Sequence, residues 1–268
     1  MNYEKIISRL WEVYTVQNPA VQKVYDLFVA RGEDVVNDHI AFRTFDDKRI
    51  DVDVLSRAFV ENGYVKKGEY KFEEKKLLAK HFEHTEDKNA PRVFISQLLT
   101  SEFSGFLQET VKKSIDKIPD EKLGSDELIH SGNLWGIPSF EIYEKLKTES
   151  EYAAWLYVYG FCANHFTVSI NYLSSLPNIE DVNNLLKNNG FLLNESGGEV
   201  KGTPEQLLEQ SSIKAEPVKI GFQEGVSEIP GCYYEFAKRY TGKDGVLFSG
   251  FIADSADKIF DSTDFYKK

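Results

Sequence analysis

Two histidines in strand-like segments are the residues of this sequence that point most directly to chemistry. His39 lies in "NDHIAFRTF" (37–45) and His165 lies in "ANHFTVSIN" (163–171). Both segments are rich in apolar, β-branched and aromatic residues, which is typical of buried strands. A single buried imidazole is often a hydrogen-bonded core residue, but two in matching segments favour a shared metal site.

A carboxylate on a third strand would complete such a site. Glu235 in "GCYYEFAKRY" (231–240) lies among apolar and aromatic residues, where an unpaired carboxylate is costly to bury. Two histidines and one carboxylate with open positions suit non-haem Fe(II), and the same ligands also accept Mn, Co, Ni or Zn. The alternative is a buried ion pair between Glu235 and Lys238 or Arg239.

Side chains alternate across a strand, so the residue two positions after each proposed ligand shares its face. These three residues are small, which would leave room beside the metal for substrate and oxygen: Ala41, Thr167 and Ala237. Arg43 shares the face of His39, and a guanidinium matches a carboxylate in a bidentate way. We therefore predict that Arg43 binds an acidic substrate, with pairing to a surface acid as the alternative.

The other histidines and both cysteines are expected to have no part in the chemistry. His81 and His84 in "KHFEH" are a rival metal pair, but three positions apart on a strand they point to opposite faces, and we expect both at the surface. His130 is expected in a solvated loop. Cys162 and Cys232 lie in apolar segments, which is typical of small buried residues, and they are too few for a disulfide framework.

The segments around the two proposed histidine ligands form an internal repeat. "DHIAF" matches "NHFTV", and "VLSRAFVENGY" matches "DVNNLLKNNGF". His39 precedes Gly63 by 24 residues and His165 precedes Gly190 by 25. Each half therefore predicts a strand, a helix that ends at Asn-Gly and several further strands. If the halves pack as a pseudo-symmetric pair, the two histidines meet near the shared axis.

The remaining elements follow from periodicity and turn residues. Two helices are expected in the N-terminal segment, the second from Pro19 to about Gly32. Further helices are expected at 46–63, within the polar stretch 101–150 and at 178–191, with a turn or short helix at 200–210 and a strand and short helix in the tail 245–266. Strands are expected at 64–72, 76–84, 91–99, 212–222 and 231–240. The pattern predicts one α+β domain over 1–268, with two pseudo-symmetric βαβββ-type repeats (about 33–100 and 156–250) around a helical insertion (about 101–155).

Composition excludes several classes of function. The chain has 268 residues, is 41% hydrophobic and carries a net charge of −11, which is typical of a globular protein and gives no support to nucleic-acid binding. No apolar run approaches the roughly 18 residues of a membrane span, and residues 1–14 do not resemble a signal peptide. A cytoplasmic protein is expected, and its oligomeric state is left open.

Four segments resemble those of the 2-oxoadipate dioxygenase/decarboxylase family, also called hydroxyglutarate synthases: "NDHIAFRTF", "ANHFTVSIN", "YYEFAKRY" and the closing "ADKIFDST". The resemblance runs from Tyr3 to about Phe265 and implies a fold similar to the vicinal-oxygen-chelate superfamily. It implies an Fe(II) site at His39, His165 and Glu235. Arg43, together with His39 and His165, would bind the substrate there.

The resemblance also implies the reaction. Family members convert 2-oxoadipate and O2 to D-2-hydroxyglutarate and CO2, in lysine catabolism. This chain is shorter than the members best known for that activity. Two other functions stay open on the same residues: a glyoxalase-like metal-dependent lyase, isomerase or hydrolase, and a non-catalytic module that binds a small acid.

Overall fold

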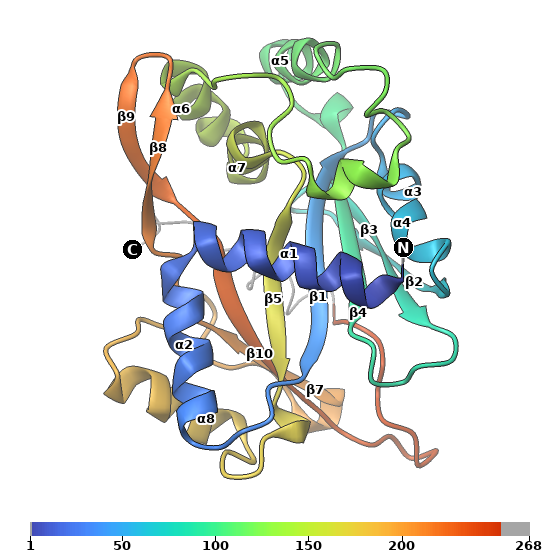
Figure 1. The fold of residues 1–268 in the computed structure, drawn as a ribbon, viewed down its shortest axis with the longest axis vertical. Coiled ribbons are helices and arrows are strands. Elements are labelled where there is room, and N and C mark those ends of the chain that lie inside the picture. Colours follow the sequence, from blue (N-terminus) through green and yellow to red (C-terminus); the bar gives the residue numbers. More distant parts are fainter. Residues whose placement is uncertain (1, 253–268) are drawn as a thin grey trace.

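A computed structural model describes residues 2–252 of the chain. In this part of the chain, an eight-stranded sheet has the order β2-β3-β4-β1-β5-β10-β7-β6, and β8 and β9 form a separate hairpin (Figure 1). The strands are β1 (Asn37–Phe45), β2 (Tyr64–Phe72), β3 (Leu77–His84), β4 (Arg92–Leu98), β5 (Ala163–Ser169), β6 (Lys201–Thr203), β7 (Leu208–Ser212), β8 (Pro217–Phe222), β9 (Gly225–Pro230) and β10 (Tyr233–Arg239).

The sheet consists of two halves with the same strand order. From the centre outward, one half runs β1-β4-β3-β2 and the other β5-β10-β7-β6. β1 pairs with β4 and β5 pairs with β10 in parallel, whereas β1 and β5 meet antiparallel at the centre. This arrangement supports the predicted duplication, with the β8–β9 hairpin as an addition to the second half. The repeat boundaries stay predictions.

The pairing of β1 with β5 contains two bulges, one in each strand. The extra residue is Asp38 in β1 and Asn164 in β5, and each lies directly before a histidine. Asp38 and Asn164 are 126 positions apart, as are His39 and His165. A bulge redirects the side chains beside it, so the symmetric bulges give both histidines the same setting.

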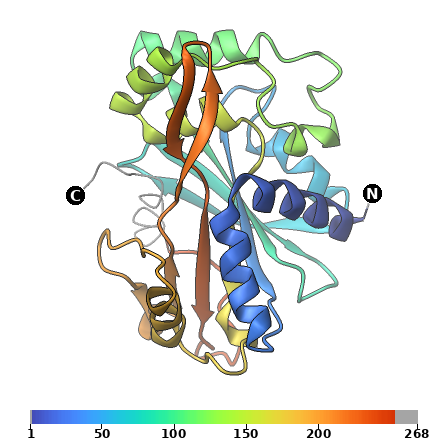
Figure 2. The same cartoon turned by 60° about the vertical axis from the view of Figure 1, so that its left-hand side comes forward.

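Helices α1 (Tyr3–Gln17) and α2 (Pro19–Ala30) cross one face of the sheet (Figures 1 and 2). The ring of Trp11 lies edge-on to Phe166 of β5 at 5.1 Å between centroids, and Phe28 lies 5.9 Å from Phe236 of β10. Burying each such aromatic side chain contributes on the order of 2–3 kcal/mol. This face is therefore the apolar core, which leaves the polar side chains of the central strands on the opposite face.

The helical insertion and the hairpin gather at one end of the sheet (Figure 2). The insertion contains α5 (Gly105–Ile115), α6 (Phe140–Glu149) and α7 (Glu151–Tyr159). The hydroxyl of Tyr152 accepts from the amide of Thr44 at 3.1 Å and donates to the carbonyl of Ser96 at 2.7 Å. These bonds tie α7 to the ends of β1 and β4.

The single helix predicted at 46–63 is wrong. The structure has two short helices there, α3 (Val52–Leu55) and α4 (Arg57–Val60), separated at Ser56. The Ser56 hydroxyl donates to the carbonyl of Asp53, a local bond that competes with a continuous helix. The other short helices are α8 (Ile179–Asn188), as predicted, and the 3-10 turns η1 (Thr100–Glu102), η2 (Asp126–His130), η3 (Ile170–Tyr172) and η4 (Pro204–Gln206).

Two other predicted segments differ from the structure. Within 200–210 the expected short helix is η4, but strands β6 and β7 of the sheet take up most of this segment on either side of it. In the tail, the described residues 246–252 form no strand beyond an isolated bridge of Leu247 to Thr241, and the expected helix, like "ADKIFDST", lies outside the described residues. Within residues 2–252, no helix is both long and apolar enough to cross a membrane.

Gly160, which ends α7 in front of β5, gives a test of this arrangement. Its φ is +65°, and a Cβ atom there would lie 2.2 Å from the carbonyl oxygen of Gly132. Strain at positive φ and the backbone clash should lower the free energy of unfolding of Gly160→Ala by about 3 kcal/mol or more in urea denaturation.

Gly190→Ala is the matched control. Gly190 has φ +83°, but no atom lies within 4 Å of the added Cβ. We expect a cost of about 1 kcal/mol there, from backbone strain alone. Equal losses in the two variants would contradict a role for the contact between Gly160 and Gly132.

Candidate metal centre

His39, His165 and Glu235 come together on the polar face of the sheet, from β1, β5 and β10. One possible ligand atom from each lies within 4.8 Å of the others. The Nε2 atom of His39 is 3.4 Å from Glu235 Oε1, and that of His165 is 3.3 Å from Oε2. All three residues are at most 3% exposed. The structure thus brings together the three residues that the sequence singled out, in a set able to hold a metal ion.

The carboxylate of Glu235 shows how well this set fits a cation. Its Oε1 atom accepts from Nε2 of Gln210, but its Oε2 atom has no hydrogen-bond donor among the described residues. A buried carboxylate oxygen without a donor costs free energy. A metal ion held by Glu235 and the two histidines would remove that cost, so the donor set fits a divalent metal.

Both histidines are held in the orientation that a metal ligand needs. The Nδ1 atom of His39 is 2.8 Å from Oδ1 of Asp38, and that of His165 is 3.0 Å from Oδ1 of Asn164. If each Nδ1–H donates to these oxygens, each Nε2 carries the lone pair that faces Glu235. The Thr167 hydroxyl, 3.1 Å from Nε2 of His39, agrees with this tautomer. Thr167 therefore contacts the proposed ligand His39 and lies two residues after the proposed ligand His165.

Sequence reasoning missed the residues that orient the two imidazoles. The signal was present, since an acid or an amide directly precedes the histidine in both copies of the repeat, in "DHIAF" and "NHFTV". Their role depends on the bulges, because in a regular strand the preceding side chain points to the other face. Gln210 was missed because β7 pairs with β10 across a long gap in sequence.

The predicted alternative of an ion pair between Glu235 and Arg239 is wrong. Arg239 binds Asp38 through Nε at 2.7 Å and Nη2 at 2.9 Å. Burial alone would raise the pKa of Asp38, but the charge of Arg239 holds that pKa well below its usual range. Lys238 lies between Ala237 and Arg239, so its side chain is on the face of the strand opposite to Glu235. Glu235 is thereby left to the two histidines and Gln210.

Burial also sets the protonation of the three ligands. It raises the pKa of Glu235 to about 8, against the lowering effect of the Gln210 hydrogen bond. Burial lowers the pKa of His39 below its usual value and that of His165 well below it, with the charges of His39 and Arg43 adding to the effect on His165. The cluster without metal is therefore neutral at pH 7, and a divalent cation that binds there displaces the proton of Glu235.

The pseudo-symmetry of the sheet defines a fourth position that carries no ligand. Glu235 pairs with Thr167 of β5, and the equivalent pair in the first half is Phe94 of β4 with Ala41 of β1. Phe94 is buried. The repeat thus defines two pairs of equivalent positions, His39 with His165 and Phe94 with Glu235, and three of these four residues can donate to a metal. Three protein ligands are expected for a metal that must also bind small molecules.

Arg43 lies on the same face of β1 as His39 and is 1% exposed. Its Nη1 atom is 3.4 Å from Oε1 of Glu151, the first residue of α7. The guanidinium carbon lies 4.8 Å from the ring centre of Tyr152 and 5.0 Å from that of Trp155. The acid partner is therefore a half-buried residue of the insertion, and two aromatic rings hold the guanidinium in place.

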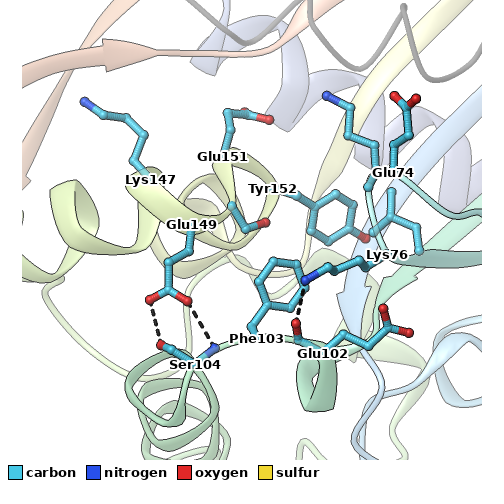
Figure 3. Close-up of a pocket in the computed structure, with 12 residues that line it drawn as sticks. Glu74, Lys76, Glu102, Phe103, Ser104, Lys147, Glu149, Glu151 and Tyr152 are labelled. Carbon is cyan, nitrogen blue, oxygen red and sulfur yellow. Dashed lines mark hydrogen bonds between the residues drawn. The ribbon is translucent and has the colours of Figure 1, made fainter.

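Glu151 and Tyr152 also line a cavity of about 500 Å³ (Figure 3). It lies between the β2–β3 turn, the start of α5 and the junction of α6 with α7. At the start of α5, Ser104 donates to Glu149 through its amide and its hydroxyl. Glu151 and Tyr152 both contact Arg43, but neither Arg43 nor a proposed metal ligand is among the residues that line the cavity.

Phe251, in the C-terminal part of the described chain, packs against the proposed ligand His39. Its ring lies 4.8 Å from that of His39 and 4.9 Å from that of Phe94. The segment is fixed by Arg239, whose Nη1 atom donates to the carbonyls of Phe248 and Gly250 at 3.1 and 2.8 Å. Nothing in the sequence signalled this contact, because it joins residues about 210 positions apart.

The surface location predicted for His81 is wrong. His81 is buried, with Nδ1 2.8 Å from the hydroxyl of Tyr70 and Nε2 3.1 Å from Oε1 of Glu83. His84 is half-buried against the ring of Tyr3. Both ring nitrogens of His81 already have partners, so the two do not form a rival metal pair.

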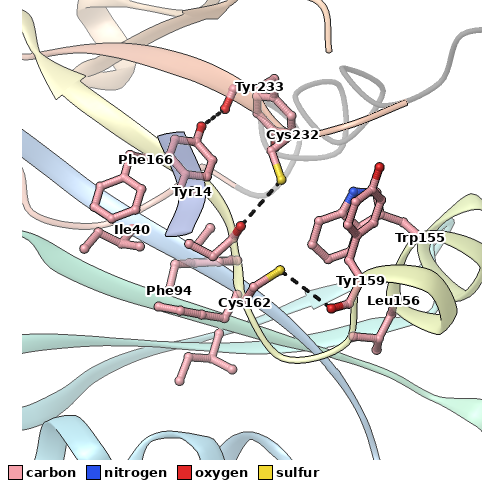
Figure 4. Packing of buried hydrophobic residues seen from close by; sticks show 14 of the residues in the cluster. Tyr14, Ile40, Phe94, Trp155, Leu156, Tyr159, Cys162, Phe166, Cys232 and Tyr233 are labelled. Carbon is pink, nitrogen blue, oxygen red and sulfur yellow. Dashed lines mark hydrogen bonds between the residues drawn. The ribbon is translucent and has the colours of Figure 1, made fainter. Parts of the chain in front are cut away.

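His130 also differs from expectation, whereas the cysteines agree with it. His130 is half-buried in η2, and burial lowers its pKa to about 4. Cys162 and Cys232 are buried and free (Figure 4). Their sulfur atoms lie 4.0 and 3.6 Å from the carbonyl oxygens of Tyr159 and Ala163. They pack as small core residues, as predicted.

The family model of the 2-oxoadipate dioxygenases/decarboxylases matches residues 2–131 and 121–245. The chain belongs to this family. A rice relative named as a chloroplast and amyloplast 2-oxoadipate dioxygenase/decarboxylase is 34% identical, over 97% of this chain and 78% of its own length. The prediction of an enzyme of this family is therefore confirmed.

Solved structures of relatives confirm the fold. The rice hydroxyglutarate synthase, solved in complex with 2-oxoadipate, is 34% identical with a TM-score of 0.91, over 97% of this chain and 91% of that one. A Shewanella frigidimarina protein named as a candidate hydrolase is 48% identical with a TM-score of 0.88, over 93% and 97%. The predicted α+β, vicinal-oxygen-chelate-like fold is thus confirmed.

The role of Asn164 can be tested by removing its side chain. In Asn164→Ala, His165 loses the acceptor that fixes its ring, and affinity for Fe(II) or Zn(II) should fall roughly 10–100-fold in anaerobic calorimetric titration. Asn171→Ala is a control, because Asn171 bonds only the backbone of Arg239 among the described residues. Equal metal affinity in Asn164→Ala and the wild type would contradict the orienting role.

Proposed function

We propose that the chain is a metal-dependent dioxygenase that decarboxylates 2-oxoadipate to D-2-hydroxyglutarate and CO2. The main observation behind this proposal is the buried set of His39, His165 and Glu235, which lies on the same face of the sheet as Arg43. One carboxylate oxygen of Glu235 has no hydrogen-bond donor among the described residues. Membership of the family and the rice relative solved with 2-oxoadipate support this substrate.

Iron(II) is the proposed metal. Two imidazoles and one carboxylate on an otherwise open site are the ligands typical of non-haem Fe(II) oxygenases. Bound there, iron would mediate electron transfer from the 2-oxo acid to O2 and would polarise the 2-oxo group. His39, His165 and Glu235 would hold it, and the charge of Glu235 would offset half of the charge of the ion.

Arg43 is proposed to bind a carboxylate of the substrate. Its guanidinium offers a bidentate fork, and the rings of Tyr152 and Trp155 restrict its movement, so little freedom is lost on binding. Because Arg43 is buried, its attraction for a carboxylate is screened less than at the surface. The substrate carboxylate would take the place that Glu151 occupies at 3.4 Å.

The surroundings of the site keep water away from the reacting groups. The ring of Phe251 covers the imidazole of His39. Ala41 lies between His39 and Arg43 on the same face of β1, and its small side chain leaves space for the acid. Exclusion of water strengthens the electrostatic contacts and limits side reactions of oxygen. The chain's own residues thus bind, orient and desolvate the acid.

A metal-dependent hydrolase is the second candidate, favoured by the Shewanella protein named as a candidate hydrolase. Consumption of oxygen separates the two. The expected cytoplasmic location and the place in lysine catabolism stay predictions, and the rice relative is a plastid protein.

The proposal can be tested by loading the protein with Fe(II) without oxygen and then adding O2 with 2-oxoadipate or 2-oxoglutarate. We expect oxygen uptake, CO2 release and formation of hydroxyglutarate that depend on both iron and 2-oxoadipate. His39→Ala should lose iron and activity together, since two ligands hold the ion far more weakly. Tight iron binding by the wild type without oxygen uptake on 2-oxoadipate would overturn the proposed substrate.

Arg43→Ala should separate substrate binding from metal binding. Loss of a bidentate charged contact, about 3 kcal/mol, should raise the KM for 2-oxoadipate on the order of 100-fold while iron content stays near that of the wild type. Arg49→Ala is the control, because Arg49 pairs with Asp47 and Asp116 at the surface. An Arg43→Ala enzyme with the KM of the wild type would rule out the substrate role.

A further inference from the structure

Tyr233 places a buried hydroxyl without a hydrogen-bond partner among the described residues beside the metal-binding set. It precedes Glu235 by two positions on β10, so it shares the face of that ligand. Its ring lies over that of His165, with 4.6 Å between centroids and 31° between planes. A buried hydroxyl without a partner is unfavourable, which suggests that its partner is a bound molecule.

The register of the sheet shows which molecule could reach this hydroxyl. Tyr233 pairs with His165 of β5, and His165 pairs with Ala41 of β1, so the three form one row across the centre of the sheet. His39 and Glu235 belong to the next row on one side. Arg43 follows Ala41 by two residues on the other side. The row of Tyr233 contains the proposed ligand His165 and lies between the row of His39 and Glu235 on one side and Arg43 on the other.

A 2-oxo acid that binds the metal at one end and Arg43 at the other would cross this row. It would pass over Ala41, whose small side chain leaves room, with Tyr233 on the side of β10. The backbone of Tyr233 is fixed, because its carbonyl accepts from the hydroxyl of Tyr14 (Figure 4). The ring is held against His165, so the hydroxyl is presented by rigid neighbours.

We propose that Tyr233 is a substrate-binding residue whose hydroxyl donates a hydrogen bond to an oxygen of the 2-oxo acid held between the metal and Arg43. This inference rests on the proposed function. The contact involves no proton transfer, because a neutral phenol donates to a carboxylate or ketone oxygen. As a third contact it would fix how the chain of the acid is turned between its two ends, and a donor of this kind selects for ligands with an oxygen at that place.

Tyr234 provides a matched control on the same strand. It is also fully buried, with a hydroxyl that has no partner among residues 2–252. Its side chain is on the opposite face, where its ring lies 5.8 Å from that of Trp11 in α1. Substitution of either tyrosine by phenylalanine removes one orphan hydroxyl, but only Tyr233 is on the face of the metal-binding set.

The test is calorimetric titration of the iron-loaded protein with 2-oxoadipate in the absence of oxygen. Tyr233→Phe should raise the Kd about tenfold, as expected for loss of one buried hydrogen bond to the ligand. Tyr234→Phe should keep the Kd within about twofold of the wild type. Iron content is measured in each variant and should be equal, because neither tyrosine is a proposed ligand.

The unfolding temperature of the ligand-free protein distinguishes this role from a structural one. Removal of an unsatisfied hydroxyl should leave Tyr233→Phe as stable as the wild type or more stable, while its ligand binds more weakly. An unchanged Kd for Tyr233→Phe would overturn the proposal, whether or not the variant is less stable than the wild type. If the wild-type protein binds iron but no 2-oxo acid, both the proposed function and the contact are overturned. If the wild type binds the acid and Tyr233→Phe binds it equally well, only the contact is overturned.

Discussion

The burial of one carboxylate governs the design of this protein. Glu235 is fully buried at the centre of the sheet, with one oxygen bound to Gln210 and the other without a donor among the described residues. An arrangement of this kind is stable only when a positive group or a proton compensates it. The two imidazoles and the bulges before them surround the place where the proposed cation would do so, and the ring of Phe251 packs against His39 beside it.

Separation of the buried charges keeps that place available. Arg239 could neutralise Glu235 from the same strand, but it binds Asp38 instead. Asp38 in turn orients His39, so one ion pair both satisfies the arginine and fixes a ligand. Arg43, at the other end of the site, is turned toward α7 and Glu151. Two guanidinium groups thus lie near the site without competing for its carboxylate.

Much of this site was predictable because two simple periodicities generate it. Alternation along the strands placed Arg43 on the face of His39, and the internal repeat brought His39 to His165. The register was not predictable, since a bulge leaves no mark on hydrophobic alternation, and so the roles of Asp38 and Asn164 were missed. Contacts between distant segments, such as Phe251 over His39, and the burial of His81 depend on packing that local patterns do not encode.

The spread of the site along the chain has a consequence for its biosynthesis. The proposed ligands come from positions 39, 165 and 235, and the covering ring from position 251. A ribosome-bound chain presents the two histidines long before Glu235 emerges, and the cover comes last. The proposed metal site and its cover are therefore incomplete in any nascent chain that has not yet emerged past residue 251, so a shorter nascent chain lacks part of the set that would hold the metal.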